Sequence, residues 1–199
     1  MSYQTKLKCV NDDGVEFFDI RKPELDLFES LKKSGMPHLE FCMSPTEKII
    51  YVWLSLYLTE ALMRNCSGKL VRSVMPQCGI STDGHLVHPP EKPGMPYSKS
   101  VRYKIDFMIL FNDSESSLFN NPANSNKDVR IAVELDGHDY HSSKQDKKRD
   151  EERNRFLLAN LIIPVHFPAS VVQHEPKKVV DQIMHIGAEW HRYFKSLNN

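Results

Sequence analysis

Residues 101–111, Val-Arg-Tyr-Lys-Ile-Asp-Phe-Met-Ile-Leu-Phe, and residues 129–135, Val-Arg-Ile-Ala-Val-Glu-Leu, determine the architecture that this chain adopts. Runs so rich in β-branched, aromatic and aliphatic residues predict two largely buried strands. The Asn- and Ser-rich segment 112–127 between them is typical of a hairpin connection. Each strand nevertheless holds one carboxylate, Asp106 or Glu134, among apolar neighbours. Charged side chains are rarely buried without a partner, so both carboxylates require an explanation.

The segments on either side of these strands predict helices and further strands. Ser44-Pro45-Thr46-Glu47 has the spacing of a capping box and predicts a helix that continues to about residue 64. The predicted order is helix, three strands, helix, strand, helix, which describes an α/β domain with helices covering a sheet. The other expected elements are a strand at 68–80, an exposed Pro- and Gly-containing loop at 81–100, a helix at 144–160, a strand at 161–167 and a helix at 177–197.

Length and charge set the domain organisation that can be expected. The 199 residues suffice for one full hydrophobic core and are too few for two. We expect a small N-terminal appendage at 1–43 and one domain at 44–199 that includes the C-terminal helix. In the appendage, Asn11-Asp12-Asp13-Gly14 predicts a hairpin turn, and residues 23–33 predict a short helix. The formal net charge is zero, so composition alone does not indicate a polyanionic partner.

The chain shows neither a secretory signal nor an apolar run of membrane-spanning length, which predicts a cytoplasmic protein without a membrane partner. The four cysteines form no Cys-x-x-Cys pair, so we expect reduced and mostly buried thiols. A zinc site is the less favoured interpretation, because its candidate ligands have suitable types but irregular spacing: Cys66, Cys78, His85 and His88.

The carboxylates of the two central strands favour a divalent metal site. Two carboxylates on neighbouring strands repel each other unless a cation lies between them. Asp136 follows Glu134 by two residues, hence on the same strand face, and adds a third hard oxygen ligand. Glu47 is a fourth candidate, but a capping box requires Glu at that position, so catalysis and capping are both open. For one strand carboxylate alone, a solvent-facing strand end or a buried salt bridge is the alternative.

A series of short motifs follows the predicted elements in order. They are Gln77 after a strand, Tyr103-Lys104-Ile105-Asp106-Phe107, Val133-Glu134-Leu135-Asp136-Gly137, His138-Asp139-Tyr140-His141, Arg149-Asp150-Glu151-Glu152-Arg153 and Val165-His166-Phe167. This series resembles the PD-(D/E)XK nuclease superfamily, and within it the branch of the very-short-patch mismatch-repair endonucleases. The resemblance covers about residues 44–172. It implies a restriction-endonuclease-like fold, a mixed β-sheet flanked by helices.

The resemblance also implies roles for individual residues. Asp106 and Glu134 match the two acidic metal ligands, and Glu47 matches the acidic residue that many members place on the helix before the sheet. Asp136 stands where the family name calls for lysine, a variant known in this branch, and would hold the metal directly or through water. A lysine or glutamine of the next helix is thought to replace that lysine. The competing positions are Lys144, which we prefer, Gln145, and Lys104, which shares a strand face with Asp106. Gln145 and Lys104 are also expected to contact nucleic acid.

Other polar residues flank the implied site. His138 and His141 directly follow the second strand and are candidates for a phosphate donor and a general acid, against a plain role in loop hydrogen bonding. Arg149 and Arg153, one helical turn apart, are candidate contacts to a phosphate backbone, although the acidic residues between them favour an ion-pair network. Gln77 is expected to have a supporting role.

The implied chemistry is hydrolysis of phosphodiester bonds with Mg²⁺ or Mn²⁺ as cofactor. We therefore expect a metal-dependent endonuclease, with DNA as the preferred nucleic acid, and leave open whether it acts as a homodimer. The substituted lysine position keeps an alternative open, a catalytically inactive nuclease-like module that binds nucleic acid or a protein partner. A structural α/β domain without any site is the third interpretation.

Overall fold

The computed structural model describes residues 6–10, 16–21, 39–63, 71–97, 100–111, 128–136 and 144–197. The chain divides into two compact units, Met1–Leu39 and Glu40–Asn199. The division falls within a short 3-10 helix, η1 (Leu39–Phe41), a few residues before the boundary expected at 43 and 44.

The described part of the first unit is a β-hairpin. Strand β1 (Lys6–Val10) pairs antiparallel with β2 (Glu16–Arg21), with an irregular register after Cys9. This pairing agrees with the hairpin predicted around residues 11–14. The short helix predicted at 23–33 lies outside the described residues.

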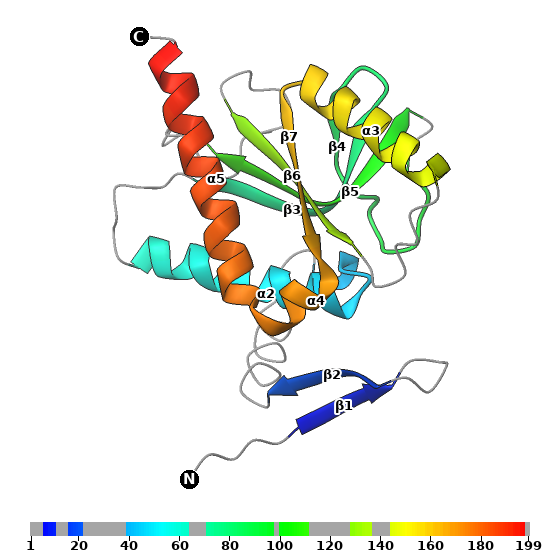
Figure 1. Ribbon diagram of the computed structural model, residues 1–199, viewed down its shortest axis with the longest axis vertical. Helices are drawn as coiled ribbons and strands as arrows, with labels where there is room; N and C mark the ends of the chain where they lie inside the picture. The colour runs from blue at the N-terminus through cyan, green and yellow to red at the C-terminus, as the bar shows by residue number, and fades with distance from the viewer. Residues whose placement is uncertain are drawn as a thin grey trace. The chain divides into compact units, whose positions relative to one another are not determined.

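A five-stranded mixed sheet forms the centre of the second unit, in the order β4-β3-β5-β6-β7 (Figure 1). The first four of these strands are antiparallel, and β7 runs parallel to β6 because helix α3 carries the chain back along the sheet. The prediction of an α/β domain with a helix-flanked mixed sheet is confirmed. The elements are α2 (Pro45–Met63), β3 (Val71–Ser81), β4 (Leu86–Val87), β5 (Val101–Phe111), β6 (Val129–Asp136), α3 (Lys144–Ala159), β7 (Ile162–Pro168), α4 (Ala169–His174) and α5 (Pro176–Leu197).

Two short elements differ from the prediction. Residues 81–100, expected to be a loop throughout, contain β4, which pairs with Gly79 and Ile80 of β3. Helix α4 joins β7 to α5 within six residues. Elements of this length hold too few residues to show a period in the sequence, which is why the hydrophobic pattern misses them.

The longest helices of the described part are α2, with 19 residues, and α5, with 22. Neither of these, nor any other helix in the described ranges, is both long enough and apolar enough to cross a membrane.

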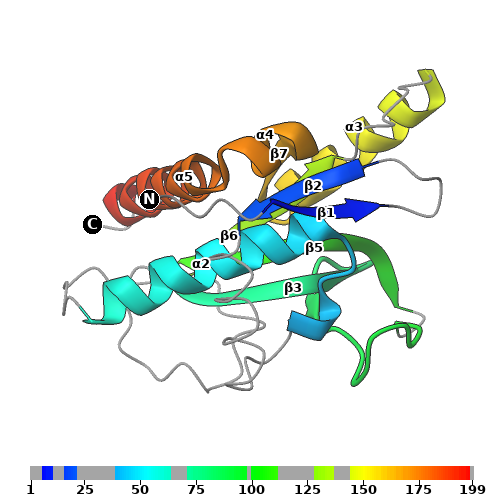
Figure 2. The same ribbon diagram turned by 90° about the horizontal axis from the view of Figure 1, so that it is seen from below.

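The sheet packs an apolar layer on each face. On one face the Tyr51 ring of α2 stacks on Phe107 with 6.3 Å between centroids, and α5 brings Gly187 against the ring of Phe111. Helices α2 and α5 also contact each other there, as the view from below shows (Figure 2). On the other face Leu157 of α3 packs with Met108, Leu110, Ala132 and Ile162. Because successive side chains of β5 point to opposite faces, this one strand serves both layers.

Strands β3 and β5 each break the regular alternation of their side chains between the two faces of the sheet, and they do so at positions that lie opposite each other. Residues of one strand that face the same layer are normally two positions apart. In the layer under α3 the step is three positions here, from Met75 to Cys78 in β3 and from Ile105 to Met108 in β5. Each strand therefore contains one extra residue between its two halves.

Gln77 and Asp106 lie at this irregular step. The register pairs the residues on either side of them, Pro76 with Phe107 among others, so the two stand opposite each other. The backbone of Gln77 takes the left-handed conformation, with a φ of 50°. The paired residues of β5 and β6 begin just past this point, at Phe107↔Val133. The step thus places Asp106 of β5 at the point where that strand has separated from β6.

Candidate active site

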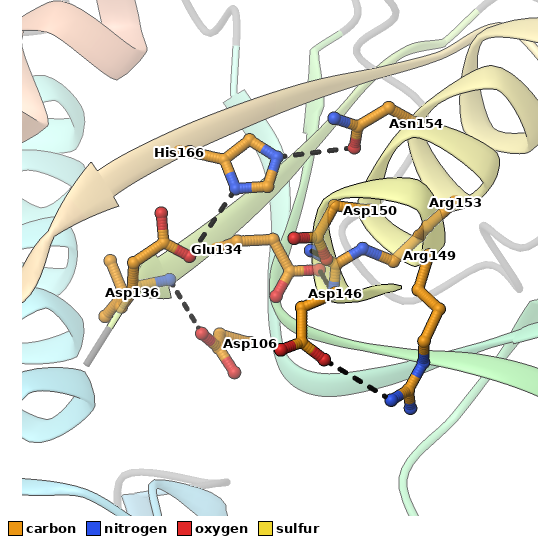
Figure 3. Close-up of polar contacts among 10 residues, drawn as sticks. Asp106, Glu134, Asp136, Asp146, Arg149, Asp150, Arg153, Asn154 and His166 are labelled. Atoms are coloured by element: carbon orange, nitrogen blue, oxygen red, sulfur yellow. Dashed lines mark hydrogen bonds and ion pairs between the residues drawn. The ribbon is translucent and has the colours of Figure 1, made fainter. Parts of the chain in front are cut away.

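Four polar residues lie in a row across the sheet, one from each of β3, β5, β6 and β7. Gln77 stands opposite Asp106, and Glu134 is paired with His166 in the parallel ladder. Extending the β5–β6 pairing by one residue brings Asp106 beside Glu134. The carboxylates of Asp106, Glu134 and Asp136 are grouped at the end of β6, next to polar side chains of α3 (Figure 3).

The Asp106 carboxylate takes the place that a backbone carbonyl has elsewhere in the sheet. The paired part of β5 ends at Phe107, and Oδ2 of Asp106 accepts the next amide of β6, Leu135 N–H, at 2.8 Å. Burial raises the pKa of Asp106 to about 6; this hydrogen bond opposes the rise, and the negative charge of Glu47 adds to it. The carboxyl group is therefore fixed in position, and a nearby cation would favour its charged form.

Glu134 is buried beside a partner that does not satisfy it completely. The residue is 7% exposed, and its Oε1 lies 3.4 Å from Nη1 of Arg153 in α3. Within the described residues, this oxygen accepts no hydrogen bond and Nε of Arg153 donates none. Burial raises the pKa of Glu134 to about 8, Arg153 partly offsets the rise, and the charges of Asp106 and Asp136 add to it. A buried carboxylate oxygen in this state is a position where a cation or donor would bind.

Helix α3 and strand β7 supply the remaining polar contacts. Nη2 of Arg153 lies 3.5 Å from Oδ1 of Asp150. His166 contacts Asp136 through Nδ1 at 3.6 Å and Asn154 through Nε2 at 3.3 Å (Figure 3). The two carboxylates of β6 are thus each held by a nitrogen-bearing side chain.

Sequence reasoning assigned no site role to His166 or Asn154. His166 is a polar residue in an otherwise apolar strand, which is the same signal that drew attention to Asp106. Asn154 lies in a helix where polar residues are expected, so no comparable signal was available for it.

Glu47 caps its helix and also links α2 to the sheet. Its Oε1 accepts Ser44 N–H at 3.2 Å, and its own N–H donates to Ser44 Oγ at 3.1 Å, which is the predicted capping box. Its Oε2 accepts Met43 N–H and the side-chain amide of Gln77, both at 2.9 Å. The residue is 7% exposed. Capping accounts for this geometry, and the charge of Glu47 nevertheless acts on Asp106, whose pKa it raises.

The carboxylates offer the oxygen donors that a small divalent cation requires, but their side chains are turned toward protein partners. Among the described residues, no three His, Cys, Asp or Glu side chains are arranged as a metal site. Glu134 is turned to Arg153, and Asp136 to His166. The Oε1 atom of Glu134, which accepts no hydrogen bond from a described residue, and the raised pKa values of Asp106 and Glu134 fit a cation that replaces these contacts. The carboxylate oxygens are thus of the donor type that a hard divalent cation takes, although in this arrangement they contact protein partners.

The residues weighed as a zinc site do not gather within the described part of the chain. Cys78 is fully buried with its Sγ 3.6 Å from the carbonyl oxygen of Val87, and burial raises the pKa of its thiol to about 12. His85 pairs with Asp83 at 3.4 Å, and Cys66 lies outside the described residues. A buried, protonated thiol fits the interpretation of Cys78 as an ordinary core residue.

Four predicted site residues cannot be placed by their side chains. Lys144 and Gln145 open helix α3, but their side chains lie outside the described part of the structure. His138 and His141 fall in the segment 137–143, which lies outside it as well.

Two further predicted residues lie at the surface. Arg149 is exposed and pairs with Asp146 at 3.7 Å (Figure 3). Lys104 is exposed with its Nζ over the Tyr97 ring, 5.0 Å from the centroid. The predicted residues that the structure groups around the row are Glu47, Gln77, Asp106, Glu134, Asp136 and Arg153.

Comparisons of the chain with protein-family models, with curated proteins and with solved structures find no match in any of the three.

Proposed function

We propose that residues 44–199 form a metal-dependent endonuclease domain with a restriction-endonuclease-like fold, acting on phosphodiester bonds of nucleic acid and preferring DNA. The observation that carries the proposal is the pair of carboxyls on adjacent strands, the half-buried Asp106 and the buried Glu134, whose pKa values are raised to about 6 and about 8. Two neighbouring buried carboxylates are costly in free energy, and a divalent cation bound between them removes most of that cost. The order of the sequence motifs supports the same class.

The residues that would hold the cation are Asp106 and Glu134, with Asp136 as a further oxygen donor, directly or through water, and Glu47 nearby on α2. When bound, Mg²⁺ or Mn²⁺ supplies Lewis acidity toward a phosphoryl oxygen and makes water easier to deprotonate. The hydrogen bond from Leu135 N–H keeps Asp106 oriented for this role.

Cationic and imidazole side chains would serve the phosphate. Arg153 lies beside Glu134, where a guanidinium could also stabilise negative charge on a phosphoryl oxygen. Lys144, at the start of α3, is the preferred replacement for the motif lysine. His141 is the candidate general acid for the leaving alkoxide, and His138 is a candidate phosphate donor.

Metal binding and cleavage, measured on the same variants, test the proposal. Wild-type protein should bind Mn²⁺ in calorimetry and cleave plasmid DNA when Mg²⁺ or Mn²⁺ is added. Asp106→Asn and Glu134→Gln should each lose Mn²⁺ affinity and reduce cleavage by roughly a hundredfold or more. The matched control is Asp181→Asn, an exposed acidic residue of α5 that pairs with Lys177 at 2.8 Å, and it should behave as wild type. Unchanged Mn²⁺ affinity in both site variants, or folded wild type that cleaves neither plasmid nor single-stranded DNA, would overturn the proposal.

A second candidate is a nuclease-like domain that binds nucleic acid or a protein without cleaving. The Arg153–Glu134 pair favours it, because a guanidinium already neutralises a carboxylate that a metal ion would need. This candidate predicts metal-independent binding, no cleavage, and no gain of Mn²⁺ affinity when Arg153 is replaced by Met. A gain of Mn²⁺ affinity in Arg153→Met would favour the endonuclease instead.

A further inference from the structure

Two exposed cations of β5 contact aromatic rings rather than acidic side chains. Several exposed cations of α3 and α5 pair with an acidic residue about one helical turn away: Arg149, Arg155, Lys177, Lys178 and Arg192. Arg102 and Lys104 lie over aromatic rings instead, and no described carboxylate pairs with either of them. Their charge is therefore not neutralised within the described part of the chain.

The ring under Lys104 is itself fixed to the sheet. Nζ of Lys104 lies 5.0 Å from the centroid of Tyr97, and the hydroxyl of Tyr97 donates to the carbonyl oxygen of Gln77. Gly79, which pairs with Lys104 in the sheet, leaves room for this ring, because a Cβ there would lie 3.1 Å from two of its carbon atoms. The Tyr97 ring under Lys104 is thus hydrogen-bonded to Gln77, whose side chain also links the sheet to Glu47.

The rings under Arg102 belong to the core. Its Cζ lies 4.6 Å from the centroid of Phe156 and 5.3 Å from that of Tyr103, and both rings pack against the apolar layer under α3. A cation supported by a ring keeps its N–H donors available while its side chain is ordered in advance. Such ordering lowers the entropy lost when an anion binds.

Arg102 and Lys104 lie on the same strand as Asp106. They precede Asp106 by four and two residues on the same strand. The pairing of β3 with β5 shifts register at Arg102, because Ile80 pairs with Tyr103 and Ser81 with Val101, and Lys104 is the next cation along the strand toward Asp106. Because one face of each supporting ring is covered by a cation, this surface offers N–H donors rather than stacking platforms for bases.

We propose that Arg102 and Lys104, supported by Tyr97, Tyr103 and Phe156, form a phosphate-backbone strip that guides a nucleic-acid strand toward Asp106 and Glu134. The choice of nucleic acid as the polyanion rests on the proposed function. Because its contacts go to phosphates, the strip should show no preference for a nucleotide sequence.

Fluorescence anisotropy in EDTA tests the strip without any cleavage. The probes are a short fluorescein-labelled DNA strand and its duplex, titrated at several KCl concentrations. The double variant Arg102→Gln/Lys104→Gln should bind roughly tenfold or more weakly, and its plot of log K against log [KCl] should be less steep by about two units. The loss should be the same for two unrelated sequences.

Matched variants separate the strip from general charge and from damage to the fold. Lys177→Gln/Lys178→Gln removes the same charge from α5 and should bind within about twofold of wild type. The charge-conserving Arg102→Lys should also bind like wild type, and thermal unfolding verifies that each variant is folded.

Several results would overturn the proposed strip. Equal losses of DNA affinity in the β5 and α5 double variants, unchanged DNA binding in Arg102→Gln/Lys104→Gln, or a loss confined to one DNA sequence would each do so. Displacement of the DNA by polyglutamate at equal charge concentration would also overturn it, because it would indicate an acidic peptide ligand. If the β5 variant loses binding but wild type never cleaves, the strip stands and the proposed endonuclease fails. If wild type cleaves and the β5 variant binds normally, the strip alone fails.

Discussion

At the scale of single residues, the contact between Glu134 and Arg153 is the most consequential one. Both groups are largely removed from water, and each keeps one buried polar atom without a hydrogen bond from the described residues. An ion pair of this kind gains less from attraction than desolvation costs, but removing one partner leaves the other uncompensated. The pair is thus a point of low intrinsic stability at which an incoming ligand can compete.

Replacing Arg153 with Met tests this view. At about pH 9 the change should lower the free energy of unfolding by about 1 kcal/mol in EDTA, because Glu134 is mostly ionised there beside Arg153 and has to take up a proton when that cation is lost. At about pH 5 the loss should be much smaller, since Glu134 is protonated there and needs no partner. Urea unfolding at both pH values measures it, and Glu134→Gln in the same chain should restore stability at the higher pH. Equal losses at both pH values would mean that Arg153 acts through packing alone.

The residues of the row were predicted from sequence to different degrees. Asp106 and Glu134 stood out because charge is rare inside apolar strands, and they lie on adjacent strands in the structure. The link from His166 to Asp136 depends on a parallel register that α3 sets across the sheet, which no local pattern records. The left-handed backbone of Gln77 was not visible either, because Gln rarely adopts that conformation.

At the scale of elements, the capped start of α2 allows capping and chemistry to be separated. Ser44→Ala removes the hydroxyl that accepts Glu47 N–H, which should cost about 1 kcal/mol of stability. Glu47 keeps its bonds to Met43 and Gln77, so DNA cleavage should stay within about twofold of wild type. Thermal unfolding and plasmid cleavage on one preparation provide both numbers. A large fall in cleavage with little change in stability would show that the cap positions Glu47 for the reaction.

Helix α5 makes an equally specific prediction at Gly187. A Cβ at this position would lie 2.1 Å from the ring of Phe111, which is fully buried. Gly187→Ala should therefore destabilise the protein by about 2 kcal/mol, even though Ala favours a helix more than Gly does. Chemical denaturation measures the change. The neighbouring Ala188→Gly serves as control and should cost about 1 kcal/mol through helix propensity alone.

Long helices and strands were predicted from the sequence more accurately than short ones. The predicted helix at 144–160 and strand at 101–111 correspond closely to α3 and β5, because charge pattern and apolar runs extend over many residues. The two residues of β4 form a strand only because β3 is beside them. The joint step in β3 and β5 arises from pairing between distant segments and has no local signature.

At the scale of the whole molecule, stability in EDTA should fall as pH rises from about 4 to about 8. The folded pKa values of Asp106 and Glu134 are raised, to about 6 and about 8, from the ordinary values of 3.8 and 4.5. The folded state therefore holds protons that the unfolded chain has released, so this contribution is present at low pH and is lost through the folded pKa values. The loss should be on the order of several kcal/mol.

Unfolding midpoints across this pH range measure the effect, with Glu134→Gln as the comparison. That variant should show a flatter profile, and Mn²⁺ should raise the midpoint of wild type more at the alkaline end than at the acidic end. A wild-type profile that rises with pH over the same interval would contradict the assignment of raised pKa values to these carboxyls.

The joint step in β3 and β5 limits how this sheet can vary between related chains. Deleting Gln77 alone would turn Cys78 and Ile80 out of their layer, and deleting Asp106 alone would do the same to the opposing half of β5. Loss of both residues together would leave two straight, fully paired strands. A chain that dispensed with this carboxylate could thus gain a more regular sheet, so related chains without it should be recognisable by a matched pair of one-residue deletions.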